Sequence, residues 1–246
     1  MKEKIRNILI MIFFFTGIPF LRYFFLKKKF KSLLRVIVFH EIKSEHVKSF
    51  QKKIVWLKNK FNLISPQDFL NKNFSKKRIN ILLTFDDGFE SWLENVIPFL
   101  KKEKISAIFF LDKRRINLAP KLAKIGFEIG SHTLSHPRLP ELPLDDINKE
   151  LKESKKILEQ KTGKKIIFFA YPFGDIKSFN KEVIRATKEA GYKYAFTILP
   201  GFNTENTTPF LLHRDGLNVS WSNFLTLAWL LGAYDWLKKI ADSFKK

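Results

Sequence analysis

The residues Ile81-Leu82-Leu83-Thr84-Phe85-Asp86-Asp87-Gly88 carry the strongest structural signal in this chain. The apolar and β-branched residues at the beginning predict a short buried strand that ends in a turn. In α/β proteins, catalytic groups gather at the carboxyl ends of parallel strands. Two adjacent carboxylates repel each other there, and a divalent metal on one would leave the other free as a base. The competing interpretation is an Asp-Gly turn that only ends the strand.

Strand and helix patterns alternate on both sides of this stretch. Further strands are expected at 35–40, 105–111, 127–131, 165–171, 192–198 and 210–213. Helical spacing of apolar residues lies between them, most clearly over 145–161 and 180–190, and the second of these has Asn180 as its N-cap. This alternation predicts an α/β fold with a mostly parallel sheet or a barrel.

The composition of the chain limits its chemistry and its partners. The 246 residues include no cysteine, so any metal must be held by histidines and carboxylates. The net charge of +21, from 45 Lys+Arg against 24 Asp+Glu, fits nucleic acid, an anionic membrane or glycan, or a coding bias toward lysine. Because the lysines are scattered and no DNA- or RNA-binding motif accompanies them, we expect no nucleic-acid partner.

The first 35 residues form an apolar and basic segment. The apolar run 8–21 is interrupted by Gly17 and Pro19, and Lys27-Lys28-Lys29 follows it. Its unbroken part is shorter than the roughly 20 residues of a spanning helix, although Arg22 could snorkel and lengthen it. We expect residues 1–35 to be a membrane anchor, spanning or interfacial. The alternative is an amphipathic helix packed on the domain.

We place the main domain at 36–220. The pattern of residues 221–246 predicts an amphipathic C-terminal helix after it. Trp229, Tyr234 and Trp236 could lie at a lipid interface. The same apolar residues would equally suit a helix that closes the bottom of a barrel.

The segment Ser131-His132-Thr133-Leu134-Ser135-His136 follows another expected strand. Two histidines four residues apart would lie on one side of a helical turn and could share a metal. With Asp87, His132 and His136 would make a site of two histidines and one carboxylate with open positions. Open positions are typical of catalytic metal sites, whereas structural sites are closed.

Two later strand ends carry further candidates. Tyr171-Pro172-Phe173-Gly174 could supply an aromatic floor for a sugar ring and backbone N–H groups for an oxyanion. Without the other motifs, it would be interpreted as a Pro-Gly turn with core aromatics. His213 could be a general acid, or only a surface histidine in a charged loop.

Together these motifs resemble the NodB-homology polysaccharide deacetylases, also called carbohydrate esterase family four. The resemblance covers roughly residues 36–217 and rests on the motifs at 84–88, 132–136 and 171–174. Val38-Phe39-His40 and the Ala-Tyr-Pro-Phe-Gly form of the third motif look like the branch that acts on poly-N-acetylglucosamine-type envelope glycans. The family implies a deformed (β/α) barrel of about seven strands and a metal-dependent removal of N-acetyl groups.

Carried over by position, the resemblance implies that Asp86 is the base and that Asp87, His132 and His136 hold the metal. We expect zinc, with Ni, Co, Fe or Mn as alternatives. The third motif would contact both the oxyanion and the sugar. The backbone N–H of Phe173 would donate to the oxyanion, and the substrate contacts would come from Tyr171, Pro172, Phe173 and Gly174.

The chain departs from the family pattern at two points. The arginine that often opens the third motif and orients the base is Ala170 here, and the last motif is only approximated by Leu212-His213-Arg214. We suggest that Arg214 replaces the missing arginine and that His213 is the acid. His40 recurs in this branch, and we treat it as structural.

The sequence thus predicts a metal-dependent N-deacetylase of an N-acetylglucosamine-type glycan, associated with the membrane of a bacterial cell envelope. Alternatives are a deacetylase of a lipid-linked sugar and a glycan-binding pseudoenzyme. More Lys and Arg follow the apolar run than precede it, which favours a cytoplasmic domain, whereas glycan processing outside would contradict that. The side of the membrane therefore stays open.

Overall fold

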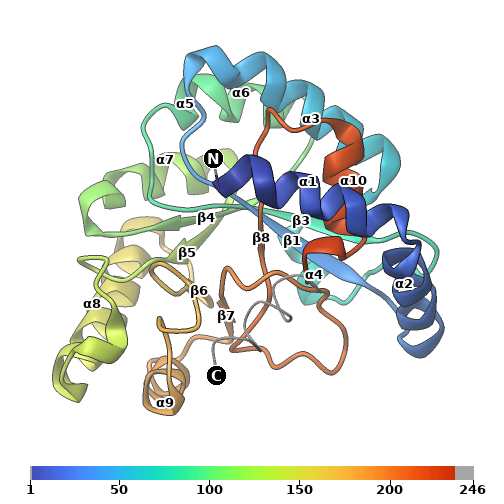
Figure 1. Cartoon of the computed structure of the whole chain (residues 1–246). Helices are drawn as coiled ribbons and strands as arrows, with labels where there is room; N and C mark the ends of the chain where they lie inside the picture. The colour runs from blue at the N-terminus through green and yellow to red at the C-terminus, as the bar shows by residue number, and fades with distance from the viewer. Residues whose placement is uncertain (1, 236–246) are drawn as a thin grey trace.

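A curled sheet of parallel strands forms the centre of the computed structural model, which describes residues 2–235 (Figure 1). The strand order is β7-β6-β5-β4-β3-β1-β8, and β2 lies beside β3. This confirms the predicted α/β fold. The strands are β1 (Leu34–Phe39), β2 (Asn62–Leu63), β3 (Asn80–Phe85), β4 (Ile108–Leu111), β5 (Glu128–Ser131), β6 (Phe168–Ala170), β7 (Tyr194–Phe196) and β8 (Asp215–Gly216).

Residues 212–216 join the two edges of the sheet, and the barrel is deformed at this segment, which we call the seam. Leu212 bridges Phe196 of β7, and β8 pairs with β1, with Asp215 opposite Ile37. Between these contacts the backbone N–H of Arg214 donates to the carbonyl of Leu199 instead of to a strand. The expected strand at 210–213 is therefore wrong, since it is a single bridge followed by the two-residue β8.

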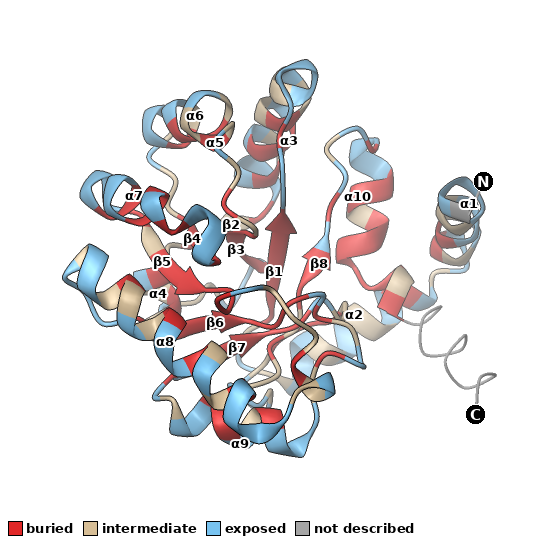
Figure 2. Ribbon diagram, turned by 90° about the vertical axis from the view of Figure 1, so that its left-hand side faces the viewer, coloured by how far each residue is buried: buried red, intermediate tan, exposed pale blue. Residues whose placement is uncertain are grey.

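The strands separate two apolar cores because side chains alternate between the faces of a sheet. In β3, Leu82 points into the barrel, whereas Ile81 and Leu83 pack against the outer helices. Figure 2 shows the strands as the buried centre of the molecule. The inner cluster consists of Leu34, Val36, Ile64, Phe69, Leu82, Ile108, Phe110, Phe168, Ala170, Phe196 and Leu212.

Amphipathic helices cover the outer face of the sheet (Figure 2). In α8, one stripe with Ile147, Leu151 and Leu158 is buried, and Gly163 ends the helix with a φ of 67°. Asn180 caps α9 as predicted, because its side chain accepts the N–H of Val183. These helices are α3 (Val47–Lys60), α5 (Trp92–Asn95), α6 (Ile97–Lys102), α7 (Ala119–Ile125), α8 (Leu144–Thr162), α9 (Lys181–Glu189) and α10 (Asn223–Leu230). The short helix α4 (Pro66–Leu70) instead places Phe69 in the inner cluster.

The N-terminal segment folds into α1 (Lys2–Phe15) and α2 (Ile18–Lys29), and α1 lies beside α10 (Figure 1). Ile10 and Phe14 are buried there, as the alternative of a packed amphipathic helix requires. Within residues 2–235, no single helix has the length and apolarity to cross a membrane, but the bent pair formed by α1 and α2 passes by length and composition. Of the C-terminal helix expected over 221–246, α10 covers residues 223–230, and the backbone turns at Gly232 with a φ of 95°. Residues 236–246, with Trp236, lie outside the described part.

Candidate active site

Asp86 lies just beyond the carboxyl end of β3, with its side chain almost fully buried. Its two carboxylate oxygens accept hydrogen bonds of 2.7 Å each from Nη1 and Nη2 of Arg214. Arg214 is held in turn by the carbonyl of Thr197, to which its Nε donates at 2.8 Å, and by contact with the ring of Phe110. This two-point pairing fixes the plane and direction of the Asp86 carboxylate.

The position of Arg214 follows from the seam of the barrel. Leu212 belongs to the inner cluster, and Arg214, two residues later, points to the same side. Ala170, at the end of β6, also lines this interior. Arg214 thus reaches Asp86 from the closing segment, which fits the suggestion that it takes over the part of an arginine at position 170.

Asp87 points away from Asp86 toward two histidines, because its backbone turns with a φ of 79°. Gly88 continues the turn with a φ of 71°, and a Cβ there would collide with Arg115 and Leu111. Oδ1 of Asp87 lies 3.5 Å from Nε2 of His132 and 3.5 Å from Nε2 of His136. The structure therefore brings together the three side chains proposed from the sequence as metal ligands.

These three groups fit a divalent metal ion. Donors about 2.0–2.1 Å from a tetrahedral ion are about 3.3 Å from one another, close to the separations of Asp87 from the two imidazoles. Nδ1 of His132 lies 2.7 Å from the carbonyl of Ala170, so the N–H is on Nδ1 and the Nε2 lone pair points to the site. Burial lowers the pKa of His132 and His136 lowers it further, although Asp86 and Asp87 act against this. A neutral imidazole is the form that binds metals.

The two histidines lie on a loop, so the expected helical turn is wrong. Thr133 and His136 have φ values of 69° and 61°, which no helical turn contains. Glu150 of α8 holds the loop, because its carboxylate accepts the N–H groups of Leu134 and Ser135 at 2.8 and 2.9 Å. Sequence reasoning missed Glu150, which looks like any other acid on the polar side of an amphipathic helix.

The motif 171–174 divides between the core and the surface. Tyr171 is fully buried and donates its hydroxyl hydrogen bond to the carbonyl of Phe210, and Pro172 is also buried. The expected sugar contact is therefore wrong for the side chain of Tyr171. Phe173 is 47% exposed, and the centre of its ring lies 4.9 Å from that of His136, so it borders the three candidate metal ligands. Gly174 lets this turn pass close to Ile198, where a Cβ would collide with the backbone.

His213 points away from the interior, since its neighbours Leu212 and Arg214 point inward. Its ring lies against Gly201, and its Nδ1 is 3.2 Å from the carbonyl of Leu199. Its backbone pairs with Asn203, which is bridged to Leu34 at the beginning of β1. The structure thus does not bring His213 to Asp86, and this placement contradicts its proposed role as the acid.

His40, and not His213, lies next to Asp86. Phe39 of β1 is paired with Phe85 of β3, so His40 and Asp86 follow side by side at the ends of adjacent strands. His40 is exposed at the edge of a hollow of about 730 Å³. The treatment of His40 as a purely structural residue therefore does not fit the geometry.

Electrostatics keep Asp86 ionised. Burial by itself would raise the pKa of this carboxyl, but Arg214, His132 and His40 together hold it below its ordinary value. A buried, ionised carboxylate next to an open group of metal ligands can accept a proton from a bound water molecule.

Comparison with known proteins gives one family. The family model described as "Polysaccharide deacetylase" matches residues 73–195, half of the chain. The Bacillus subtilis protein YxkH is 25% identical over 206 residues, which cover 77% of this chain and 73% of YxkH. The poly-beta-1,6-N-acetyl-D-glucosamine N-deacetylase of Staphylococcus aureus is 27% identical over 201 residues, 71% of this chain and 68% of that protein.

The chain spans only about half the length of several other curated relatives that it matches. Among solved structures, the Streptococcus pyogenes deacetylase PplD in complex with acetate has a TM-score of 0.70. That likeness covers 81% of this chain and 99% of PplD at 19% sequence identity, so it concerns the fold alone.

Proposed function

This chain belongs to the polysaccharide deacetylase family, and on that premise we propose that it removes N-acetyl groups from an N-acetylglucosamine-type glycan of the cell envelope. The reaction is the hydrolysis of an amide: water adds to the acetyl carbonyl, the C–N bond breaks, and acetate and an amino sugar leave. The name of the Staphylococcus aureus relative supports this class of substrate.

The observation that carries the proposal is the pairing of Arg214 with Asp86 beside three potential metal ligands. Arg214 keeps the Asp86 carboxylate ionised and aimed, so Asp86 can take a proton from the attacking water. Asp87, His132 and His136 would hold a divalent metal ion, for which zinc is our first choice. Such an ion would polarise the acetyl carbonyl and make bound water more acidic.

The third motif supplies the other wall of the site. The backbone of Phe173 takes a φ of 61°, and its exposed ring stands beside His136 and under the guanidinium of Arg138. We assign the N–H of Phe173 to the developing oxyanion and its ring to the sugar face. Arg138 is itself held by Asp175, at 2.7 Å, which makes this wall rigid.

The proton for the departing amine has to come from a group near Asp86. An amide nitrogen leaves poorly as an anion, so the reaction needs a general acid. The strand register places His40 beside Asp86, and His40 is exposed to the hollow at the ends of β1 and β8. We therefore propose His40 as the acid, in place of His213.

A second function has one observation in its favour. Exposed apolar side chains on α1 and α2 suit an enzyme that works near lipid, as a deacetylase of a lipid-linked sugar would. A glycan-binding pseudoenzyme is less well supported, because Arg214 occupies the place that Ala170 leaves open.

The test is acetate release from purified protein. A panel would contain acetylated poly-glucosamine, peptidoglycan fragments and a lipid-linked N-acetylated sugar, each assayed after chelation and after adding back single divalent metals. We expect release only with metal, and none from Asp86→Asn protein that still binds the metal. Metal-independent release, or equal release by the Asp86→Asn variant, would contradict the mechanism. Release only from the lipid-linked sugar would favour the second function.

A further inference from the structure

Helices α1 and α2 carry an exposed apolar surface, here called the hairpin face. Its side chains are large and apolar, and each is between 38% and 75% exposed. Large exposed patches of this kind mark sites of protein or membrane contact. The members are Ile5, Ile8, Leu9, Ile12, Phe15, Ile18, Phe20, Leu21, Phe24 and Phe25.

The opposite side of the same helices is bound to the domain. Phe14 packs edge-on against Phe224 of α10, at 5.2 Å between ring centres, and the guanidinium of Arg6 lies over the ring of Trp229. Arg22 forms an ion pair with Asp235 at 2.9 Å. The pair α1–α2, here called the N-terminal hairpin, therefore has one side packed against the domain and one side exposed. The axes of its two helices are bent by 69°.

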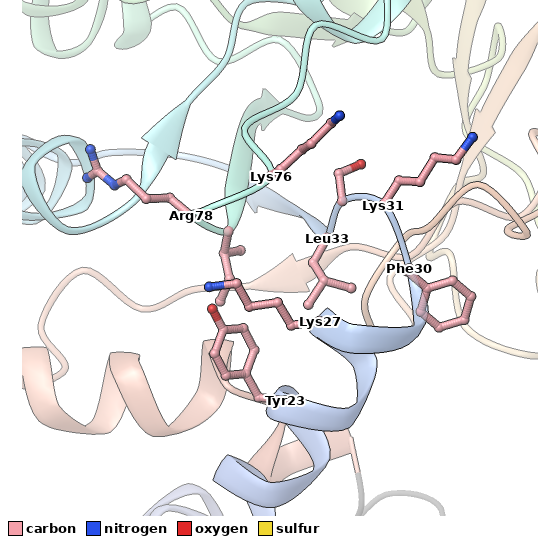
Figure 3. Close-up of a pocket in the computed structure, with 9 residues that line it drawn as sticks. Tyr23, Lys27, Phe30, Lys31, Leu33, Lys76 and Arg78 are labelled. Carbon is pink, nitrogen blue, oxygen red and sulfur yellow. The ribbon is translucent and has the colours of Figure 1, made fainter.

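A group of cations borders the hairpin face at the end of α2, and we call it the basic rim. Figure 3 shows Lys27, Lys31, Lys76 and Arg78 at a small pocket that Tyr23 also lines. They come from α2, the link to β1 and the loop before β3. Lys28 and Lys29 are exposed on the same turn of α2. Residues 4–40 and 69–85 contain no Asp or Glu, although Glu205 accepts the backbone N–H of Lys31.

We propose that the hairpin face and the basic rim together bind the surface of a bilayer with anionic headgroups. The apolar side chains would enter the boundary between headgroups and acyl chains, and the lysines would meet the headgroup charge. The hairpin lies in this interface while it stays packed on α10, because Ile10 and Phe14 are buried against the domain. This inference does not depend on the proposed enzymatic function.

The basic rim lies away from the candidate active site. The basic rim flanks Leu33 and Ile79, which precede β1 and β3, whereas Asp86 follows the other end of β3. The site and the rim thus lie at opposite ends of the same strands.

The proposal is tested by co-sedimentation of the full chain with phosphatidylglycerol-containing vesicles and with pure phosphatidylcholine vesicles. Wild-type protein should bind the anionic vesicles more strongly. The pair Lys28→Gln and Lys29→Gln should weaken anionic binding about 30-fold, since one lysine near the surface is worth about 1 kcal/mol. The same pair should change binding to phosphatidylcholine little.

The pair Phe24→Glu and Phe25→Glu should weaken binding to both vesicles, by more than about tenfold. Matched controls are Val55→Glu with Ile125→Glu on α3 and α7, and Lys181→Gln with Lys188→Gln on α9, all at exposed positions. Controls should bind like wild type. Circular dichroism and thermal unfolding would show that each variant folds.

Four results would overturn the proposal. One is wild-type protein that binds neither kind of vesicle, and another is that the hairpin variants bind as strongly as their controls. The third is a wild-type dimer in analytical ultracentrifugation that the Phe24→Glu and Phe25→Glu pair dissolves, because a second copy would then be the occupant. An alkaline wash should release vesicle-bound protein, and protein that resists it would have inserted the hairpin across the bilayer instead.

Discussion

At the scale of single residues, Asp86 and Asp87 are neighbours with opposite surroundings. Asp86 is buried under Arg214, and Asp87 faces His132 and His136 from a partly exposed turn. The left-handed backbone of Asp87 and Gly88 separates the two carboxylates, so one can act as a base while the other binds a metal. Each depends on partners from distant parts of the chain.

The first residue-scale prediction concerns Arg214. Arg214→Met should leave Asp86 buried without a counter-charge, lower kcat strongly and destabilise the fold by about 3–5 kcal/mol. Adding Ala170→Arg to that variant should restore part of kcat and part of the stability, because position 170 lines the same interior. Steady-state kinetics and urea unfolding would measure this. An unchanged kcat in Arg214→Met would show that Asp86 needs no orienting partner.

The second residue-scale prediction separates the two candidate acids. His40→Ala should lower kcat and remove the alkaline limb of the pH–rate profile, with little change in metal content. His213→Ala should leave that limb in place, because its ring points toward Leu199 and Gly201. If the limb disappears only in His213→Ala, the assignment drawn from the strand register is wrong.

At the scale of elements, α8 does more than cover the sheet. One of its acids, Glu150, binds the loop that carries both histidines, so the helix sets the position of two of the proposed metal ligands. Metal-site partners of this indirect kind commonly influence affinity.

The prediction for α8 is a loss of metal affinity. Glu150→Ala should weaken binding of the metal about 10- to 100-fold, because the loop loses three hydrogen bonds that hold its non-helical backbone. Glu153→Ala, an exposed acid on the same helix, is the matched control and should bind metal normally. Calorimetric titration of both proteins would measure the difference, and equal affinities would exclude a supporting role for Glu150.

A second prediction at this scale concerns the charges where β1, β8 and α10 meet. Arg35 is fully buried and pairs with Asp215 and Asp235. Arg35→Met should destabilise the fold by about 3–5 kcal/mol at neutral pH, because the buried Asp215 loses its cation and Asp235 keeps only Arg22. Urea unfolding with wild type as reference would measure this.

The pH dependence of that variant has a definite sign. Burial raises the pKa of Asp215 to about 7 even with Arg35 present, while Arg35 and Arg22 keep the pKa of Asp235 low against burial. Without Arg35, the folded-state pKa of Asp215 rises further and that of Asp235 rises too, although Arg22 still opposes the rise at Asp235, so the folded variant binds more protons than folded wild type. The free energy of unfolding of Arg35→Met should therefore come closer to that of wild type as the pH falls from about 7 toward 4. A difference in unfolding free energy between wild type and variant that grows on acidification would contradict this.

At the scale of the whole molecule, the N-terminal hairpin is a part of the fold and also carries the surface that we propose binds lipid. It contributes Ile10 and Phe14 to the outer core, and Arg22 to the ion pair with Asp235. A simple detachable anchor would have neither.

Removing residues 1–29 should therefore release the protein from membranes and also destabilise it. Burial of Ile10 and Phe14 alone is worth about 3–6 kcal/mol, and the deletion uncovers their partners on α10. The pair Phe24→Glu and Phe25→Glu should release the protein without this loss. Chemical unfolding of both proteins would compare them, and an equally stable deletion would mean that the hairpin does not pack as described.

Much of the molecule could be predicted from local sequence. The alternation of strands and helices, the end of β3 at Asp86, the cap at Asn180 and the likeness to the polysaccharide deacetylases are all encoded in short stretches. Periodicity and turn chemistry act over a few residues, so such features can be seen without a structure.

Only the tertiary structure decided which distant side chains meet. The pairing of Arg214 with Asp86 joins residues 128 positions apart, and it depends on how the segment 212–216 closes the barrel. The same seam turns His213 outward, while the pairing of β1 with β3 brings His40 beside Asp86. Glu150 reshapes a loop that spacing alone suggests is helical. Sequence patterns determine which face of an element a residue lies on, but strand order and loop contacts determine what that face meets.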